Sequence, residues 1–227
     1  MMRTANPALN VNAFAQAKSF SDTGVMTIQG TVNRTFILLL ISVFSVAMVW
    51  NKFFTSANPA AVMPWLWGGA LGGFVVAIIT IFKKEWAPTT APIYAFLEGL
   101  FLGGISSLFE AQFPGIVMQA VGLTFGVLFS LLLAYKSGLI KPTQNFRLGV
   151  VAATGAIMVF YFASIVLSFF GIRISMIHGS GPIGIGFSLF VVAIAALNLV
   201  LDFDFIEQGS SRGAPKYMEW YGAYELL

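Results

Sequence analysis

The sequence predicts an all-α protein, a polytopic membrane helix bundle with six visible spans. Its 227 residues are 58% hydrophobic and only 9% charged, with a mean hydropathy of +0.86, whereas an average soluble domain carries about 25% charged residues. Six apolar segments approach the roughly 20 residues that a helix needs to cross a hydrocarbon core. The strands of a membrane β-barrel would instead alternate over about 10 residues. Lipid is therefore the expected solvent for most of the chain.

The same composition excludes several classes of function. Twelve basic and nine acidic residues are too few to cover a water-soluble enzyme, and the apolar content excludes a disordered chain. Because the chain has no cysteine, it has no disulfide, thiolate metal site or cysteine nucleophile, and its single histidine, His178, excludes a multi-histidine metal site. A nucleotide-binding loop of Walker type is absent from the sequence as well. We therefore expect neither an enzyme nor a bound cofactor.

The six expected spans follow one another with short connections. The first is the shortest, and Asn33 and Phe53 mark how far it can extend. Every span is a continuous apolar run rather than an alternating one, which favours a helix in each case. In chain order the expected spans cover residues 35–50, 64–82, 92–109, 115–135, 148–170 and 181–201.

The basic residues predict the orientation of these spans. Ten of the twelve lie in the leader, in the second and fourth connections or in the tail, and only Lys52 and Arg173 lie in the alternate loops. Such a bias is typical of the positive-inside rule, so we expect the N-terminus and the last residues to be cytoplasmic. The pI of about 9.3 then reflects topology, and we expect no nucleic-acid partner.

Three regions follow from this topology. Residues 1–33 are expected to form a cytoplasmic leader, because they lack the apolar core of a cleavable signal peptide. Residues 34–207 form the transmembrane bundle. Residues 208–227 are expected to be a cytoplasmic tail or the start of a seventh helix. Glycines four residues apart predict close helix packing; they are Gly68/Gly72, Gly69/Gly73, Gly99/Gly103 and Gly122/Gly126.

One carboxylate lies well inside an expected span. Glu98 comes about seven residues into the third span, with Gly99, Gly103 and Gly104 close behind it. An ionisable side chain at membrane depth costs about 2.5–3.5 kcal/mol on insertion scales, so it requires a partner, water or a function. Two interpretations are equally open: a protonated Glu98 bonded to a neighbouring group, or a ligand for a cation or proton.

A second group of carboxylates lies at the end of the sixth span. Asn198 and Asp202 are four residues apart and share a helix face, whereas Asp204 is turned by about 200° from Asp202. Asp204 and Glu207 are therefore expected nearer the cytoplasmic interface. All three acids could simply be hydrated at the helix end, although Phe203 and the following apolar residues continue the run beyond Asp202.

These acids suggest a pH-sensitive cation site. Carboxylates are hard oxygen ligands of the kind that calcium prefers. A carboxyl group in a low-dielectric environment has a raised pKa and can exchange protons for cations near neutral pH. The candidate site residues are Asp202, Glu98 and Asp204, with calcium as a bound or permeant ion and the lipid bilayer as the main partner.

Several sequence motifs resemble the Bax inhibitor-1 family, the transmembrane Bax inhibitor motif group, in its bacterial YccA-like branch. The resemblance extends over nearly the whole chain and is most specific at the end of the sixth span. The motifs are Asn6-Pro-Ala-Leu9, Met26-Thr-Ile-Gln-Gly-Thr31, the segment 94–110, Leu199-Val-Leu-Asp-Phe-Asp-Phe-Ile-Glu207 and Gly213-Ala-Pro-Lys-Tyr-Met-Glu-Trp-Tyr-Gly222.

The resemblance implies a seven-helix protein that acts as a pH-dependent calcium leak pathway in the bacterial cytoplasmic membrane. In this family a pair of aspartates on the sixth and seventh helices shares a proton. Asp202 matches the sixth-helix aspartate, and Asp204 is the alternative register. The seventh helix would begin close to Glu225, so the resemblance names no partner carboxylate. The second span carries no basic residue to face such a pair, which suggests that Glu98 belongs to the gating network instead.

The leading function is therefore a passive, proton-sensitive calcium or cation leak. Two alternatives stay open. The first is a non-conducting regulator or interaction partner of a membrane protease or stress-response complex, in which Glu98 and the glycine pairs only pack. The second is a proton-coupled secondary transporter, which the short loops and the lack of an inverted repeat disfavour.

Overall fold

The computed structural model describes residues 24–56, 58–171 and 181–227. Most of the expected leader, the loop residue Arg173 and the single histidine, His178, lie outside the described residues. Statements about the leader as a whole therefore stay predictions.

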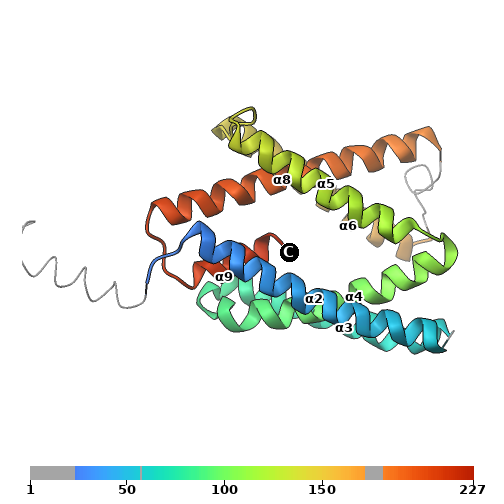
Figure 1. The fold of residues 1–227 in the computed structure, drawn as a ribbon. Coiled ribbons are helices and arrows are strands. Elements are labelled where there is room, and N and C mark those ends of the chain that lie inside the picture. Colours follow the sequence, from blue (N-terminus) through green and yellow to red (C-terminus); the bar gives the residue numbers. More distant parts are fainter. Residues whose placement is uncertain (1–23, 57, 172–180) are drawn as a thin grey trace, which may run out of the picture. The chain divides into compact units, whose positions relative to one another are not determined.

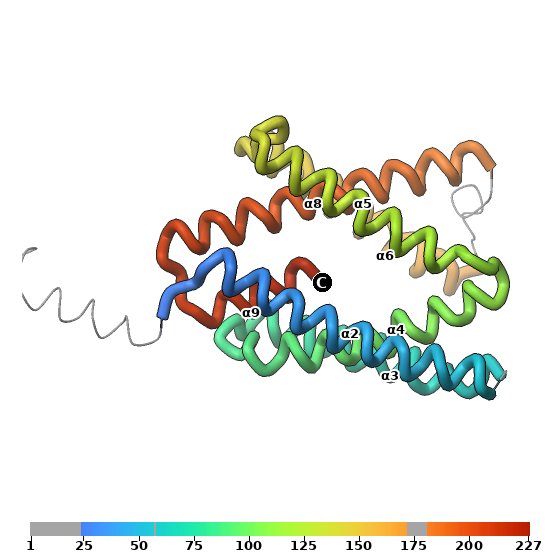
Figure 2. The backbone as a smooth tube through the Cα atoms, in the orientation of Figure 1, coloured from blue at the N-terminus to red at the C-terminus, as the bar shows by residue number. Residues whose placement is uncertain are grey.

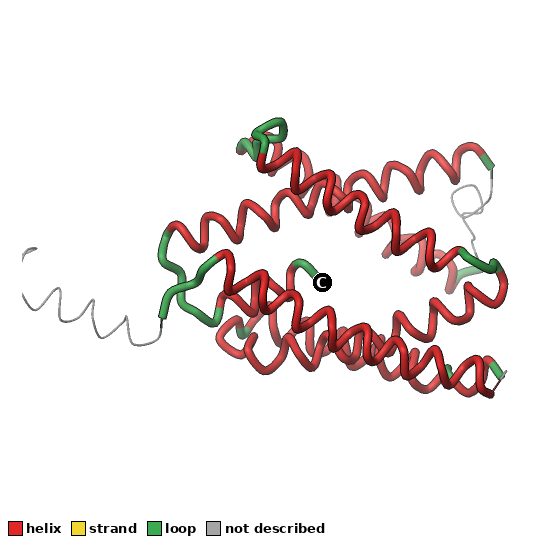
Figure 3. Tube along the Cα trace, in the orientation of Figure 1, coloured by secondary structure: helices red, strands yellow, loops and turns green. Residues whose placement is uncertain are grey.

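The described chain is helical, as the sequence predicts (Figures 1 and 3). Two short 3₁₀ turns, η2 (Pro59–Ala61) and η3 (Lys84–Trp86), join the first helices. Six α-helices are long and apolar enough to cross a membrane, which confirms the predicted class of fold. The helices are α2 (Ile28–Ser56), α3 (Met63–Phe82), α4 (Ala87–Gln112), α5 (Ile116–Lys136), α6 (Gln144–Phe169), α8 (Pro182–Ser211) and the short α9 (Met218–Glu225).

Five of the six long helices exceed the expected spans, and the difference is largest for α2, α4 and α8. Helix α2 begins at Ile28, inside the expected leader, because Thr27 caps it as described below. Helix α4 begins at Ala87 and contains Pro92, which membrane helices tolerate when neighbouring groups satisfy the freed carbonyl. Helix α8 continues to Ser211, so the acidic residues at its end are still helical.

The chain divides into two compact units. The first contains residues 1–114 and 206–227, of which the described helices are α2, α3, α4 and α9. Here α4 packs against both α2 and α3, and α9 packs against α2 and α4 (Figure 2). A buried apolar cluster joins α2, α4 and α9; it consists of Leu38, Ala91, Ala95 and Ala223.

Glycines bring the backbones of the first unit together. A Cβ at residue 99 would collide with Ser45 and Ser42 of α2, and one at residue 103 would lie 2.9 Å from the Val46 carbonyl. Gly69 similarly lies against the α4 backbone, where a Cβ would come within 2.5 Å of the Leu97 oxygen. Small residues allow this close approach in lipid. The structure thus gives Gly99/Gly103 and Gly69 the packing role that the sequence predicts.

The second unit, residues 115–205, is held together differently. Its helices α5, α6 and most of α8 meet through long side chains. Phe160 of α6 lies 5.3 Å from Phe187 of α8, measured between ring centroids, and Tyr135 of α5 lies 6.0 Å from Phe203. A methyl group added at Gly122 or Gly126 would have no neighbour within 4 Å. The predicted packing of this glycine pair is therefore not found within the described residues.

Candidate functional site

Glu98 lies at the centre of a membrane-spanning helix. The apolar helical segment around it runs from Lys84 to Gln112, which places Glu98 at its middle residue. The side chain is half-buried, and its Oε2 atom is fully buried without a hydrogen-bond partner among the described residues. A buried polar atom of this kind is uncommon in native proteins. The helix therefore holds, in the middle of an apolar segment, a buried carboxylate oxygen that no described residue hydrogen-bonds.

Two tyrosines adjoin this carboxyl group. Tyr94 precedes Glu98 by one helical turn and hydrogen-bonds to it. The Tyr94 ring meets the ring of Tyr224 from α9 edge to face, with the centroids 4.8 Å apart. Burial, followed by the nearby charges of Glu225 and Glu98, raises the pKa of Tyr224 to about 12. Tyr224 thus stays protonated near neutral pH and brings a neutral hydroxyl group close to the carboxyl group.

A second carboxylate in this unit, Glu219 of α9, caps the N-terminus of α2. The Thr27 hydroxyl accepts a hydrogen bond from the Gly30 backbone N–H at 2.9 Å. Glu219 Oε1 accepts hydrogen bonds from the Thr27 backbone N–H at 3.1 Å and from the Thr27 hydroxyl at 3.0 Å. In an ordinary capping box, a glutamate three residues after the N-cap threonine accepts a hydrogen bond from the backbone N–H of that threonine. Here glycine occupies that position and a distant glutamate replaces the missing side chain.

Arg34 completes this arrangement. Its guanidinium lies 3.5 Å from Glu219 Oε2 and 4.8 Å from the centroid of the Trp220 ring. Its Nε atom is buried without a hydrogen-bond partner in the described chain. Glu219 is only 2% exposed, and a buried carboxylate is tolerated when it is paired and hydrogen-bonded. We refer to Glu219, Thr27, Gly30 and Arg34 together as the Glu219 cap.

The turn after α8 brings the C-terminal segment to this cap. Gly213 has φ +67°, and the N–H groups of Gly213 and Ala214 donate to the carbonyls of Ser210 and Gly209. This is the Schellman pattern that ends helices at a left-handed glycine. The chain then pairs with the residues before α2, since the Met26 N–H donates to the Ala214 carbonyl at 2.7 Å and the Lys216 N–H donates to the Gly24 carbonyl at 3.1 Å.

Asp204 has an ionic partner in the second unit. Its Oδ2 atom lies 2.5 Å from an Arg147 guanidinium nitrogen at the start of α6, and the Asp204 side chain is 14% exposed. Arg147 Nε also donates to the Pro142 carbonyl at 3.2 Å, which fixes the direction of its side chain. The second span lacks a basic residue, so α6 supplies the arginine that faces this acidic segment.

Asn198 and Asp202 lie one turn apart on α8, and both precede Asp204 on that helix. Asn198 Nδ2 donates to the Thr154 hydroxyl of α6 at 2.8 Å and to its own helix at the Ile194 carbonyl at 2.9 Å. Asp202 is half-buried and also has interactions within the protein. The facing sides of α6 and α8 therefore carry polar groups along the segment of α8 that contains the candidate aspartates.

The predicted site residues fall in both units. Glu98 belongs to the first unit, whereas Asp202 and Asp204 belong to the second, on one helix. Among the described residues, no three histidine, aspartate or glutamate side chains are close enough to hold a metal ion. Each carboxylate is therefore evaluated in its own surroundings.

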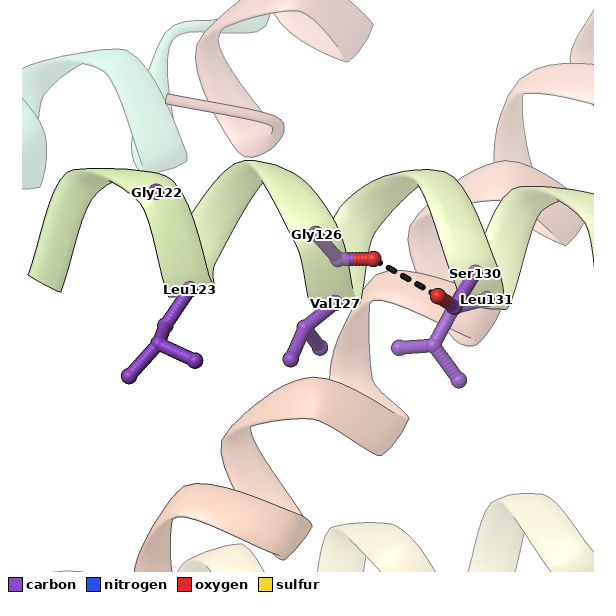
Figure 4. Close-up of a pocket in the computed structure, with 6 residues that line it drawn as sticks. All are labelled: Gly122, Leu123, Gly126, Val127, Ser130 and Leu131. Atoms are coloured by element: carbon purple, nitrogen blue, oxygen red, sulfur yellow. Dashed lines mark hydrogen bonds between the residues drawn. The ribbon is translucent and has the colours of Figure 1, made fainter. Parts of the chain in front are cut away.

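One shallow depression of about 380 Å³ lies on α5 (Figure 4). It is open and mostly apolar, and all its lining residues come from one face of α5. The only polar side chain in it, Ser130, donates to the Gly126 carbonyl at 2.7 Å. The depression therefore presents no group that would bind an ion.

Sequence reasoning did not assign a role to Glu219 or Arg34. Both lie near segments that carry the family resemblance, yet Arg34 counted only toward membrane orientation. One local signal was present: Thr27 is followed three residues later by glycine instead of the glutamate of a capping box. Only the structure shows that Glu219, 192 residues after Thr27, supplies the carboxylate in its place.

Together, six apolar helices and half-buried carboxylates within them define a polytopic α-helical membrane protein with ionisable groups inside its spans. The model of the family described as Bax inhibitor 1 like matches residues 6–227, so the chain belongs to this family. Neither the curated proteins nor the solved structures searched gave a match.

Proposed function

We propose that this Bax inhibitor-like membrane protein is a passive, pH-sensitive leak pathway for calcium or a similar cation. In this proposal Asp202 is the proton sensor, and Glu98 and Asp204 are supporting carboxylates. The protein would lie in the bacterial cytoplasmic membrane with its N-terminus in the cytoplasm, an orientation that the distribution of basic residues supports.

The observation that carries the proposal is the buried Oε2 atom of Glu98 at the middle of α4, which has no hydrogen-bond partner in the part of the chain that the structure describes. Maintaining an ionisable group at this depth is costly, and such groups generally mark ion or proton pathways. The neighbouring tyrosines offer neutral hydroxyl groups rather than a cation, so they leave the acceptor capacity of this oxygen available for a proton or a metal ion.

The Arg147–Asp204 ion pair supports a gating role for the end of α8. While the pair is intact, the guanidinium occupies the carboxylate that a cation would otherwise bind. Protonation of Asp204 would remove the attraction between the two side chains and weaken the contact between α8 and the start of α6. The pair thereby offers a physical link between proton binding and a movement of α8.

The proposal is tested by calcium flux into proteoliposomes that contain the purified chain, measured as a function of pH. We expect a flux whose pH dependence flattens in Glu98→Gln, because an amide cannot exchange a proton for a cation. Glu85→Gln is the matched control, since Glu85 is exposed and lies outside the helices α3 and α4 that it connects.

A chain that reconstitutes correctly but conducts no cation at any pH would contradict the leak proposal. It would favour the second candidate, a non-conducting regulator of another membrane protein. An unchanged pH profile in Glu98→Gln would remove Glu98 from the pathway while leaving the leak itself in place.

A further inference from the structure

We propose that Glu219 is a positioning residue for the Glu98 site. Its carboxylate holds α9 against the N-terminus of α2 and thereby seats Tyr224 next to Tyr94 and Glu98. The functional half of this inference rests on the proposed role of Glu98, whereas the holding role of Glu219 does not.

Both carboxylate oxygens of Glu219 have partners, and those that the described residues supply lie on α2 or just before it. Oε1 accepts two hydrogen bonds from Thr27, and Oε2 faces Arg34. The N-terminus of a helix also attracts negative charge through its unsatisfied N–H groups. Since Glu219 is itself in the first turn of α9, one side chain connects the beginnings of two helices.

Helix α2 has space at residue 30 for this side chain. A Cβ at residue 30 would collide with the Glu219 carboxyl group. Glycine is unfavourable inside a helix by roughly 0.5–1 kcal/mol relative to alanine, so its presence at the third helical position needs a reason. The space for the Glu219 carboxylate supplies that reason.

Contacts along α9 connect Glu219 to the surroundings of Glu98. Helix α9 is held by its packing against α2 and α4. Ala223 is fully buried in the cluster with Ala91 and Ala95 of α4, and the next residue, Tyr224, contacts Tyr94. Loss of the contact at Glu219 would therefore loosen the segment that covers the Glu98 side of α4.

The natural chain contains no cysteine, so introduced pairs report contacts without background. Ala95→Cys with Ala223→Cys reports the docking of α9 on α4. Val25→Cys with Pro215→Cys supplies a covalent replacement for the contact between the two segments. These two residues form an antiparallel bridge flanked by hydrogen bonds, a pairing with Cα atoms about 4.5 Å apart that suits a disulfide.

The experiment measures the rate of cross-linking between residues 95 and 223 in the full chain in proteoliposomes. We expect Glu219→Ala to slow it several-fold, Glu219→Gln to slow it less because the amide oxygen still accepts from Thr27, and Glu85→Ala to leave it unchanged. Gly30→Ala should reproduce the Glu219→Ala effect by displacing the carboxylate. Gly68→Ala should leave the cross-linking rate unchanged, because a Cβ at residue 68 has no neighbour within 4 Å.

The same variants are assayed for calcium flux against pH, without the cysteine pair at residues 95 and 223. We expect the pH profile to shift in Glu219→Ala and to return towards the natural profile when the disulfide between residues 25 and 215 is formed in that variant. This return would separate a positioning role from general misfolding.

Undiminished cross-linking in Glu219→Ala would overturn the holding role. Slowed cross-linking with an unchanged pH profile would overturn the link to Glu98. If the natural chain shows no flux, the proposed leak fails, and the cross-linking rates still decide whether Glu219 positions α9.

Discussion

Arg147 and Asp204 form an ion pair between the start of α6 and the end of α8, with 2.5 Å between the paired nitrogen and oxygen. Asp204 is the more buried partner, at 14% exposed, whereas Arg147 is 42% exposed. The arginine comes from the first turn of α6, the fifth span, and not from the second span. This pair joins Asp204 of α8 to the start of α6 within the second unit.

The ion pair predicts a measurable coupling between the two side chains. In a double-mutant cycle with Arg147→Gln and Asp204→Asn, we expect a coupling of about 1 kcal/mol in the free energy of unfolding, because one partner is substantially exposed to solvent. The cycle is measured by denaturant unfolding in detergent. Lys136→Gln, an exposed cation at the end of α5, replaces Arg147→Gln as the control. Additive effects in the Arg147–Asp204 cycle would show that the pair contributes nothing.

Gly99 predicts a second, steric effect. Gly99→Ala should destabilise the first unit by about 1–3 kcal/mol, because the added methyl group collides with Ser42 and Ser45 and forces α2 away from α4. Gly126→Ala should be neutral or mildly stabilising, since that position is open and alanine favours the helix. Thermal unfolding in detergent compares the two variants. Equal stability of both would be inconsistent with the close crossing of α2 and α4.

Asn198 and Thr154 predict a smaller effect in the second unit. Thr154→Val removes the hydroxyl that accepts from Asn198 while keeping the shape of the side chain. Hydrogen bonds between membrane helices contribute about 0.6 kcal/mol on average, so we expect a loss of that order in unfolding free energy. Thr124→Val is the control, because the Thr124 hydroxyl donates to the Ala120 carbonyl of its own helix and to no other described residue. If Thr154→Val lowers the free energy of unfolding no more than Thr124→Val does, the hydrogen bond between α6 and α8 makes no contribution to stability.

The sequence was sufficient for the six long apolar helices because each apolar run is long and continuous. It placed helix ends less well. The beginning of α2 depends on a capping carboxylate contributed by Glu219, and the end of α8 depends on a left-handed turn at Gly213. Both features involve contacts or backbone angles that apolar periodicity does not encode.

The candidate site was predictable in part. Glu98 stands out in sequence because a charge interrupts an apolar span, and the structure adds the buried oxygen and the tyrosine from α9. The ion pair of Asp204 was not predictable, since nothing local relates Arg147 to a residue 57 positions later. Spacing along a helix shows which residues share a face, but not which neighbouring helix that face meets.

The most direct test of the proposed function is calcium flux through reconstituted Asp202→Asn across the physiological pH range. We predict that this variant loses most of the pH dependence of the natural chain, because its amide cannot take up or release a proton. Glu207→Gln, an exposed position on the same helix, should keep the natural profile. A pH dependence in Asp202→Asn identical to that of the natural chain would contradict the assignment of Asp202 as the sensor.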